Sequence, residues 1–208
     1  MPKKGTTDYT HIFAIASTQA GYFTAKQAHL AGYTKNNITY LVKAGHFERI
    51  KRGFYRLRVF PASSHEDVIA AWLKAGADRA FVSHETALGL YELYPGRAHR
   101  IDITVHREHL PRFKYREVLP GVRLHTVRRP LRPDEVRRQF GVRVTSPART
   151  IVDAAEAGVD PGYIVDAVAQ ALRRGVVTGR ELESAAADRT RRVRDLIKSQ
   201  LNSMSLIV

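Results

Sequence analysis

The pattern of apolar and polar positions between residues 21 and 57 predicts two short helices, a tight turn and a β-hairpin. Thr24 begins a capping-box sequence at the start of the first helix, and Gly32 is suited to leave that helix in a left-handed conformation. Thr34 is placed to cap the second helix and Gly45 to end it. Two capped helices followed by a hairpin are typical of a winged helix-turn-helix, which is a DNA-binding module.

The second helix of this pair has two different faces. Ile38, Leu41 and Val42 recur at helical spacing and form an apolar stripe that faces a core. The opposite side carries residue types that suit a major groove, because Asn can contact adenine, Thr a thymine methyl, and Lys guanine or phosphate. The DNA-contacting residues predicted on this helix are Thr34, Lys35, Asn36, Thr39, Tyr40 and Lys43. An ordinary amphipathic helix has the same pattern, so this helix alone is weak evidence.

The hairpin strengthens the DNA-binding interpretation. Apolar residues mark two short strands, and Gly53 supplies a turn residue that tolerates positive φ. Arg49, Lys51, Arg52 and Arg56 make the tip basic, and a basic wing can grip the phosphates that flank a groove. The predicted phosphate contacts are Lys26, at a helix start, with Lys51 and Arg52 at the wing tip.

The rest of the chain predicts an α+β protein with two domains. A helix over 9–20 supports the winged domain, residues 1–60, and a mixed α/β domain follows over 61–208. Within the second domain, 61–146 mixes strands with helices and 147–208 is helical. Ser63 and Glu66 form a capping-box signature for a helix to about residue 75. The other predicted elements are strands at 80–82, 100–105, 122–127 and 142–145, helices at 84–93 and 188–201, helix starts at 146, 160 and 178, and an arginine- and proline-rich loop at 128–133.

Charge favours a polyanionic partner. The chain of 208 residues has a formal net charge of +14, of which residues 1–60 carry +8, 61–150 carry +6 and 151–208 carry none. There is no cysteine, which excludes disulfides and thiolate metal sites. No apolar run approaches the roughly 20 residues that span a bilayer. The N-terminus also lacks the apolar core of a secretion signal, so we expect a cytoplasmic protein without a membrane partner.

The motifs of common enzymes are each incomplete. His84-Glu85 begins like a zinc-protease motif, but Leu88 stands where the second His is needed. The metal-capable residues of 106–109 are packed too closely for a known zinc spacing. There is no Cys pair of the deaminase type, no Gly-x-Ser-x-Gly elbow and no phosphate-binding glycine loop. We therefore expect neither a catalytic centre nor a metal or other cofactor.

Arg149 is the most unusual single residue. It lies in a first helical turn, where the helix dipole disfavours a cation, and Asp153 follows one turn later as a partner. The sequence leaves two interpretations open, which are a buried structural ion pair and a contact with a phosphate or a protein partner.

Taken together, the chain resembles the AbiEi family of antitoxins from bacterial type IV toxin–antitoxin systems. Four stretches carry the likeness, and together they span most of residues 12–175. They are the winged domain with its Arg52-Gly53-Phe54-Tyr55 step, Ser83-His84-Glu85-Thr86-Ala87-Leu88, Ile101-Asp102-Ile103-Thr104-Val105, and Thr145-Ser146-Pro147-Ala148-Arg149-Thr150-Ile151-Val152-Asp153.

The resemblance implies a DNA-binding antitoxin and transcriptional autorepressor. Such a protein binds inverted repeats of double-stranded DNA in its own promoter and counteracts a nucleotidyltransferase-like toxin encoded next door. Repressors of this kind read two half-sites as dimers. A stand-alone winged helix-turn-helix transcription factor, with a ligand- or protein-binding C-terminal domain, is the alternative. The sequence leaves the operator, the toxin and the oligomeric state open.

Overall fold

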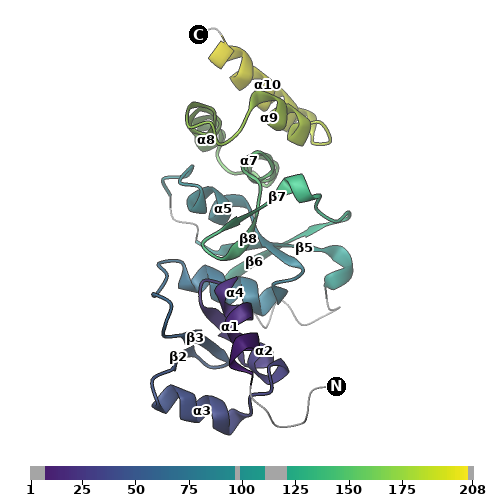
Figure 1. The fold of residues 1–208 in the computed structure, drawn as a ribbon. Helices are drawn as coiled ribbons and strands as arrows, with labels where there is room; N and C mark the ends of the chain where they lie inside the picture. The colour runs from purple at the N-terminus through teal and green to yellow at the C-terminus, as the bar shows by residue number, and fades with distance from the viewer. Residues whose placement is uncertain (1–7, 97–98, 111–120, 206–208) are drawn as a thin grey trace. The chain divides into compact units, whose positions relative to one another are not determined.

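The computed structural model describes residues 8–96, 99–110 and 121–205, and its class is α+β, as the sequence predicts (Figure 1). The chain divides into two compact units. The first comprises Met1–Ala77 with Phe140–Val142, and the second comprises Asp78–Gln139 with Arg143–Val208. The domain limits inferred from the sequence, 1–60 and 61–208, remain a prediction.

The first unit has the element order of a winged helix-turn-helix (Figure 1). Its elements are α1 (Tyr9–Ser17), β1 (Tyr22–Thr24), α2 (Ala25–Leu30), α3 (Lys35–Lys43), β2 (Phe47–Lys51), β3 (Phe54–Leu57) and α4 (Glu66–Gly76). The strands form an antiparallel sheet in the order β1-β3-β2, in which Phe23 lies opposite Tyr55. The short strand β1 therefore joins the sheet of the wing by pairing with β3.

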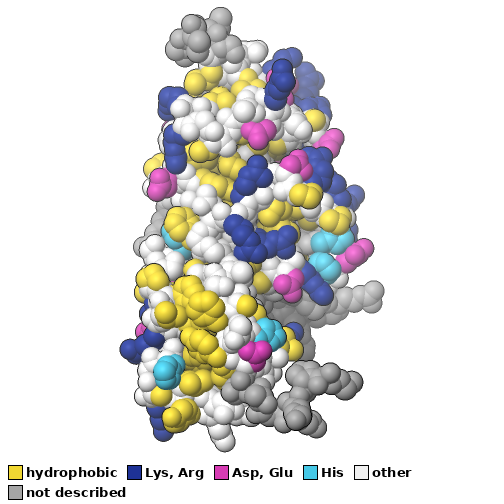
Figure 2. Space-filling model, viewed as in Figure 1, with side chains coloured by type: hydrophobic (Ala, Val, Ile, Leu, Met, Phe, Trp, Pro, Cys, Tyr) yellow, Lys and Arg dark blue, Asp and Glu magenta, His cyan; other side chains and the backbone are white. Residues whose placement is uncertain are grey.

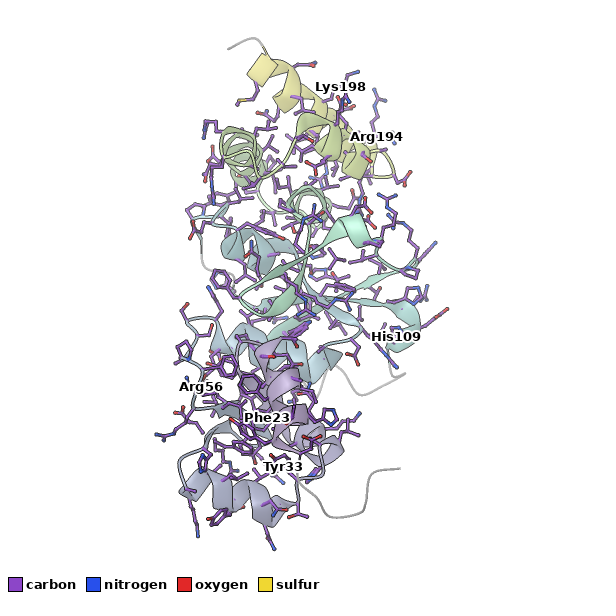
Figure 3. The ribbon with its side chains drawn as sticks, in the orientation of Figure 1. Phe23, Tyr33, Arg56, His109, Arg194 and Lys198 are labelled. Atoms are coloured by element: carbon purple, nitrogen blue, oxygen red, sulfur yellow. The ribbon has the colours of Figure 1, made fainter. Side chains whose placement is uncertain are left out.

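Aromatic side chains fill the core of the first unit. Phe23 and Phe47 are fully buried, and their rings meet edge to face with centroids 5.0 Å apart. Tyr33 lies at the end of the turn between α2 and α3, and its ring centre is 5.7 Å from that of Phe47, which connects the helix pair to the sheet. Figure 3 labels Phe23 and Tyr33 within this core. Aromatic rings bury the largest area per residue, which suits a small domain with few core positions.

Two predicted helix boundaries in the first unit are wrong. α1 ends at Ser17 rather than near residue 20, because Ala20 (φ 55°) and Gly21 (φ 88°) adopt left-handed conformations that turn the chain. α4 begins at Glu66 without a side-chain cap. The Tyr22 hydroxyl instead donates to the Glu66 carboxylate at 3.0 Å and accepts from the backbone N–H of Ser63 at 2.9 Å.

The second unit contains a five-stranded mixed sheet in the order β6-β5-β4-β8-β7. Its strands are β4 (Ala80–Val82), β5 (Ile101–His106), β6 (Val122–Val127), β7 (Val136–Gln139) and β8 (Val142–Thr145). β4 pairs with β5 antiparallel and with β8 parallel, and β5 pairs with β6 parallel. The sequence predicts four of these strands and misses β7, whose residues Val-Arg-Arg-Gln are mostly polar. Residues 128–132 form a loop, as predicted, before the short 3₁₀ turn η2 (Pro133–Glu135).

Helices make up the C-terminal part of the second unit. They are α7 (Pro147–Glu156), α8 (Pro161–Arg173), α9 (Gly179–Ala186) and α10 (Arg191–Ser205), and α5 (His84–Leu90) precedes them in the chain. α7 is the central helix. It is buried from Pro147 to Ala155 and packs against α5, α8, α9 and α10. Within the described residues, no helix is both long and apolar enough to cross a membrane.

Candidate nucleic-acid interface

Local hydrogen bonds set the helix pair of the first unit. The Thr24 hydroxyl accepts from the Gln27 backbone N–H at 3.2 Å, and the Gln27 amide oxygen accepts from the Thr24 N–H at 2.8 Å. This is the capping box that the sequence predicts. Gly32 (φ 84°) then reverses the chain in a left-handed conformation. The Tyr33 N–H closes the turn by donating to the Ala28 carbonyl at 3.0 Å.

A second capping box starts α3. The Thr34 hydroxyl accepts from the Asn37 N–H at 3.2 Å, and the Asn37 side-chain oxygen accepts from the Thr34 N–H at 3.1 Å. Gly45 (φ 81°) ends the helix. The hydroxyl of Thr34 is thus committed to the cap, which gives this residue a structural reason to be present in addition to its predicted DNA contact.

Burial divides α3 along the predicted line. Ile38 is buried, and Leu41 and Val42 are half-buried against the core. The other side of the helix is exposed, and Tyr40 has 69% of its surface accessible. The exposed residues on this side are Lys35, Asn36, Thr39, Tyr40 and Lys43. Their assignment as DNA contacts stays a prediction.

The polar groups on the exposed side of α3 differ in whether they are free to hydrogen-bond with DNA. The Thr39 hydroxyl donates to the Lys35 carbonyl at 2.9 Å, so its proton is already engaged within the helix. Within the described chain, the Asn36 amide and the Tyr40 hydroxyl make no hydrogen bond. Asn36 therefore has its full donor and acceptor capacity free for a base edge.

The wing is basic at its tip but has fewer free cations than the sequence indicates. Arg49, Lys51 and Arg52 are exposed, and Gly53 (φ 75°) makes the turn. Arg56 is not a tip residue, because it lies opposite Glu48 in the sheet, pairs with that carboxylate and donates to the Phe60 carbonyl. Figure 3 labels Arg56 within the first unit.

An acidic residue lies beside the wing tip. The Lys51 ammonium is 3.6 Å from the Asp67 carboxylate of α4 and 5.7 Å from the centre of the Phe54 ring. Both members of this ion pair are exposed, so the pair stabilises the fold little. The negative charge of Asp67 nevertheless repels an approaching phosphate. Lys26 is exposed in the first turn of α2, and Arg52 makes no ion pair within the described part of the chain.

Arg149 lies in a buried ion network of the second unit. Its Nε is 2.7 Å from Asp153 and its terminal nitrogen is 2.8 Å from Glu135, and the residue is 6% exposed. Glu135 also receives two hydrogen bonds from Arg129, and Asp153 pairs with Arg189. This geometry supports the structural ion pair among the two interpretations that the sequence leaves open.

The network makes the second unit acid-sensitive. Burial by itself would raise the pKa of Glu135, but hydrogen bonds from Arg129, the Arg132 N–H and Arg149 outweigh it and lower that pKa from 4.5 to about 2. A carboxylate whose pKa is depressed on folding stabilises the fold above its unfolded pKa. We expect that contribution to be complete above pH 4.5 and lost as the pH falls toward 2. Urea unfolding at a series of pH values should show this loss, and Glu135→Gln should remove it.

A buried polar cluster of the second unit was not foreseen. The His84 and His125 rings stack with centroids 3.5 Å apart, and His125 Nε2 is 2.8 Å from Asp102 Oδ1. Ser83 lies within 2.9 Å of His84 Nδ1 and accepts from the Thr104 hydroxyl at 2.8 Å. Burial, followed by the neighbouring His125, lowers the pKa of His84 to about 3, so His84 is neutral at ordinary pH.

The sequence contains one indication of this cluster. Asp102 and Thr104 occupy the polar positions of an alternating strand, yet both are buried, which requires polar partners on the covering elements. The partners come from α5 and β6, which are distant in sequence. Among the residues that the structure describes, no three His, Asp or Glu side chains are grouped so that they could hold a metal ion.

Comparison with known proteins places the first unit in a family context. Residues 12–58 match the model of the family described as "Transcriptional regulator, AbiEi antitoxin", which confirms the resemblance for this segment. Among solved structures, the chain is similar to the crystal structure of the RV2827C protein from Mycobacterium tuberculosis. The TM-score is 0.54 at 12% identity over 97% of this chain and 78% of that one, so the likeness concerns the fold alone. No curated protein sequence matches.

Proposed function

We propose, because residues 12–58 match the AbiEi antitoxin family of transcriptional regulators, that this chain is a DNA-binding antitoxin that represses its own operon. It binds an inverted repeat as a dimer through α3 and the wing. Its second unit counteracts a nucleotidyltransferase-like toxin of a type IV toxin–antitoxin system. The protein acts in the cytoplasm and is not an enzyme.

The observation that carries the DNA-binding part is the exposed polar side of α3. A recognition helix needs a buried apolar side that fixes its position and a free polar side that meets base edges. α3 has Ile38 on the first side and the unengaged Asn36 amide on the second. Arg52 lies at the basic tip of the wing, in the turn between β2 and β3, where a wing contacts the phosphates beside the groove.

The wing prediction concerns salt dependence. Arg52→Ala should weaken binding to operator and scrambled DNA alike, and should reduce the slope of log affinity against log salt by about one unit. Lys51→Ala should have a smaller effect, because Asp67 already opposes the charge of Lys51. For the same reason, Asp67→Asn should strengthen binding to both duplexes. Fluorescence-anisotropy titrations at four salt concentrations measure these slopes.

Lys74→Ala is the matched control for the wing variants. Lys74 is exposed on α4 of the same unit and belongs to neither α3 nor the wing. Lys74→Ala removes one positive charge, as Arg52→Ala does. It therefore distinguishes the loss of a phosphate contact at the wing from the general effect of a lower net charge. A slope change for Lys74→Ala as large as that for Arg52→Ala would contradict a role for the wing.

The direct test of the repressor part is footprinting on the promoter that precedes this reading frame. Protection of an inverted repeat, with half-sites about 10 base pairs apart, is the expected result for a dimer that reads successive major grooves. Protection of the promoter that is no stronger than that of random DNA would overturn the proposal.

The antitoxin part is tested by co-expression. If the neighbouring reading frame is toxic alone and the full chain rescues growth, the proposal is supported. Rescue should persist with Arg52→Ala, because the near-neutral helical part, residues 147–208, is proposed to make the protein contacts. The alternative function, a stand-alone transcription factor, predicts promoter binding without any neighbouring toxin to neutralise.

A further inference from the structure

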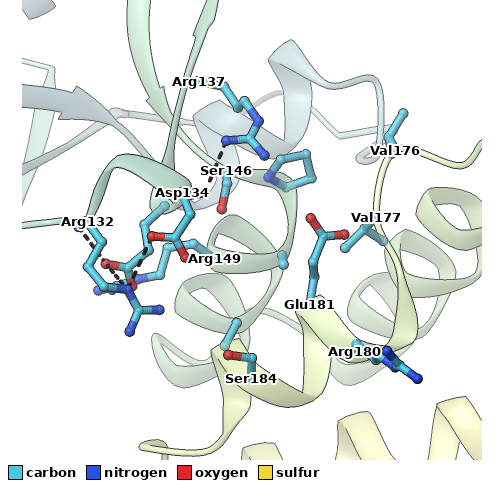
Figure 4. A pocket seen from close by; sticks show the side chains of 14 residues that line it. Arg132, Asp134, Arg137, Ser146, Arg149, Val176, Val177, Arg180, Glu181 and Ser184 are labelled. Carbon is cyan, nitrogen blue, oxygen red and sulfur yellow. Dashed lines mark hydrogen bonds and ion pairs between the residues drawn. The ribbon is translucent and has the colours of Figure 1, made fainter.

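A cavity of about 260 Å³ opens in the second unit at the start of α7 (Figure 4). Three segments line it, which are 132–137 around η2 and β7, 146–149 at the beginning of α7, and 176–185 with α9. The DNA-binding role proposed for the first unit neither requires nor explains this cavity.

Ser146 is the residue that marks the cavity as a site. It is 6% exposed and occupies the N-cap position of α7, yet its side chain caps no backbone N–H. Its backbone N–H donates to the Glu135 carbonyl at 2.7 Å, but its hydroxyl has no hydrogen-bond partner among the described residues. Figure 4 shows the hydroxyl oxygen directed toward the open centre of the cavity. The hydroxyl oxygen reaches the open space of the cavity instead of being fully buried, so a ligand atom can supply its partner there.

The helix itself adds donors to the same place. α7 has ten residues, and its first intrahelical acceptor is the Ser146 carbonyl, which receives the Thr150 N–H at 2.8 Å. The N–H groups of Ala148 and Arg149 precede that bond and have no acceptor within the helix. The positive end of the helix dipole reinforces them. The start of α7 therefore has the general properties of an anion-binding helix terminus.

Arg137 contributes a full positive charge at the rim of the cavity. One of its terminal nitrogens donates to the carbonyls of Asp134 and Val136, each at 3.1 Å, which holds the guanidinium in place. Its other nitrogens make no hydrogen bond within the described chain. In Figure 4, Arg137 and Ser146 lie on the same side of the cavity.

The acidic groups of the cavity are mostly neutralised. Glu135 is paired with Arg149, and Asp134 lies 3.3 Å from the Arg132 guanidinium. Glu181 is the exception. One of its oxygens accepts from the Thr178 N–H at 2.7 Å, and these hydrogen bonds to Thr178 lower its pKa, so it is charged. Glu181 therefore limits how tightly an anion binds.

We propose that this cavity binds the phosphate monoester group of a small molecule. The Ser146 hydroxyl and the N–H groups of Ala148 and Arg149 donate to the phosphate oxygens, and Arg137 supplies the opposing charge. A helix end, a hydroxyl and a guanidinium thus line one cavity, and phosphate groups bind to helix N-termini in this way. The remaining volume holds the organic part of the ligand.

The test uses the full chain and two probes, inorganic phosphate and adenosine monophosphate, in isothermal titration calorimetry at low salt. Saturable binding of either probe is expected. Tighter binding of adenosine monophosphate identifies a nucleotide-like ligand, and equal binding identifies phosphate as the whole recognised group. Absence of binding for both probes overturns the proposal.

Two variants of Ser146 separate ligand binding from folding. Ser146→Ala should weaken binding about tenfold, the usual loss for one hydrogen bond to a charged group. It should leave the melting temperature unchanged, because the hydroxyl forms no cap. Ser146→Asp should abolish binding by charge repulsion while keeping or raising the melting temperature, because Asp is a favoured N-cap residue. Binding that survives Ser146→Asp would exclude this site.

Glu181→Gln tests whether the group bound in the cavity is negatively charged. Gln can keep the capping box of α9, so the fold should be retained. Loss of the carboxylate should strengthen phosphate binding severalfold, whereas unchanged or weaker binding would show that the phosphate does not lie beside Glu181 in this cavity and would contradict the proposal. Lys198→Gln, an exposed position on α10 that does not line the cavity, is the control for net charge. A loss there equal to that of Ser146→Ala would contradict the proposal.

Discussion

Replacing Arg149 with Met is expected to lower the free energy of unfolding by about 3 kcal/mol. Arg149 is buried and forms short ion pairs with Glu135 and Asp153, so its removal leaves two buried carboxylates with one partner fewer each. The loss stays near the lower end of the range for broken buried pairs, because Arg129 still binds Glu135 and Arg189 still binds Asp153. Urea unfolding followed by circular dichroism measures the change.

Arg173→Met is the control for this substitution. Arg173 is exposed at the end of α8, and exposed positions without special contacts usually change stability by less than about 0.5 kcal/mol. A loss below about 1 kcal/mol for Arg149→Met would show that the remaining arginines compensate fully. Arg149 would then be free for another role, and the phosphate or partner contact left open by the sequence would become the better interpretation.

The elements of the first unit could be predicted because their signals are local. A capping box spans four residues, and a glycine after a helix acts on its own neighbours, so Thr24, Thr34, Gly32 and Gly45 are correctly assigned from the sequence alone. The apolar stripe of α3 is also local, because one helix turn separates its members. These features need no knowledge of tertiary contacts.

Three of the failures have the opposite cause, because contacts between residues distant in sequence decide them. Ser63 and Glu66 have the spacing of a capping box, but the hydroxyl of Tyr22, more than 40 residues earlier, engages both of them. The sequence predicts Arg56 as a cation of the wing tip, but the strand register places Glu48 opposite Arg56. β7 has one apolar residue in four and is recognised only through its place at the edge of the sheet.

At the candidate phosphate cavity, the sequence predicts the start of a helix correctly but does not reveal the cavity beside it. Ser146 followed by Pro147 predicts a helix start, and α7 does begin there. The sequence also implies that Ser146 caps the helix, whereas its hydroxyl forms no such bond. Only the surrounding segments reveal that this end of the helix faces a cavity and not solvent.

Replacing Asn36 with Ala is expected to weaken binding to the operator by roughly 1–3 kcal/mol and to leave binding to random DNA unchanged. Asn36 is exposed in the first turn of α3, and its amide is free to form a bidentate contact with adenine. Ala is a better helix former than Asn, so the fold should not suffer. Anisotropy titrations on operator and scrambled duplexes, at one fixed salt concentration, measure the difference.

The neighbouring Asn37 provides the matched contrast for Asn36. Its side chain closes the capping box of α3 by accepting from the Thr34 N–H at 3.1 Å. Asn37→Ala should therefore lower stability by about 0.5–1 kcal/mol, while losing little discrimination between the two duplexes. Asn202→Ala, at an exposed position of α10, should change neither property. Equal losses on operator and scrambled DNA for Asn36→Ala would remove Asn36 from the base-reading surface and leave Thr39 and Tyr40 as its candidates.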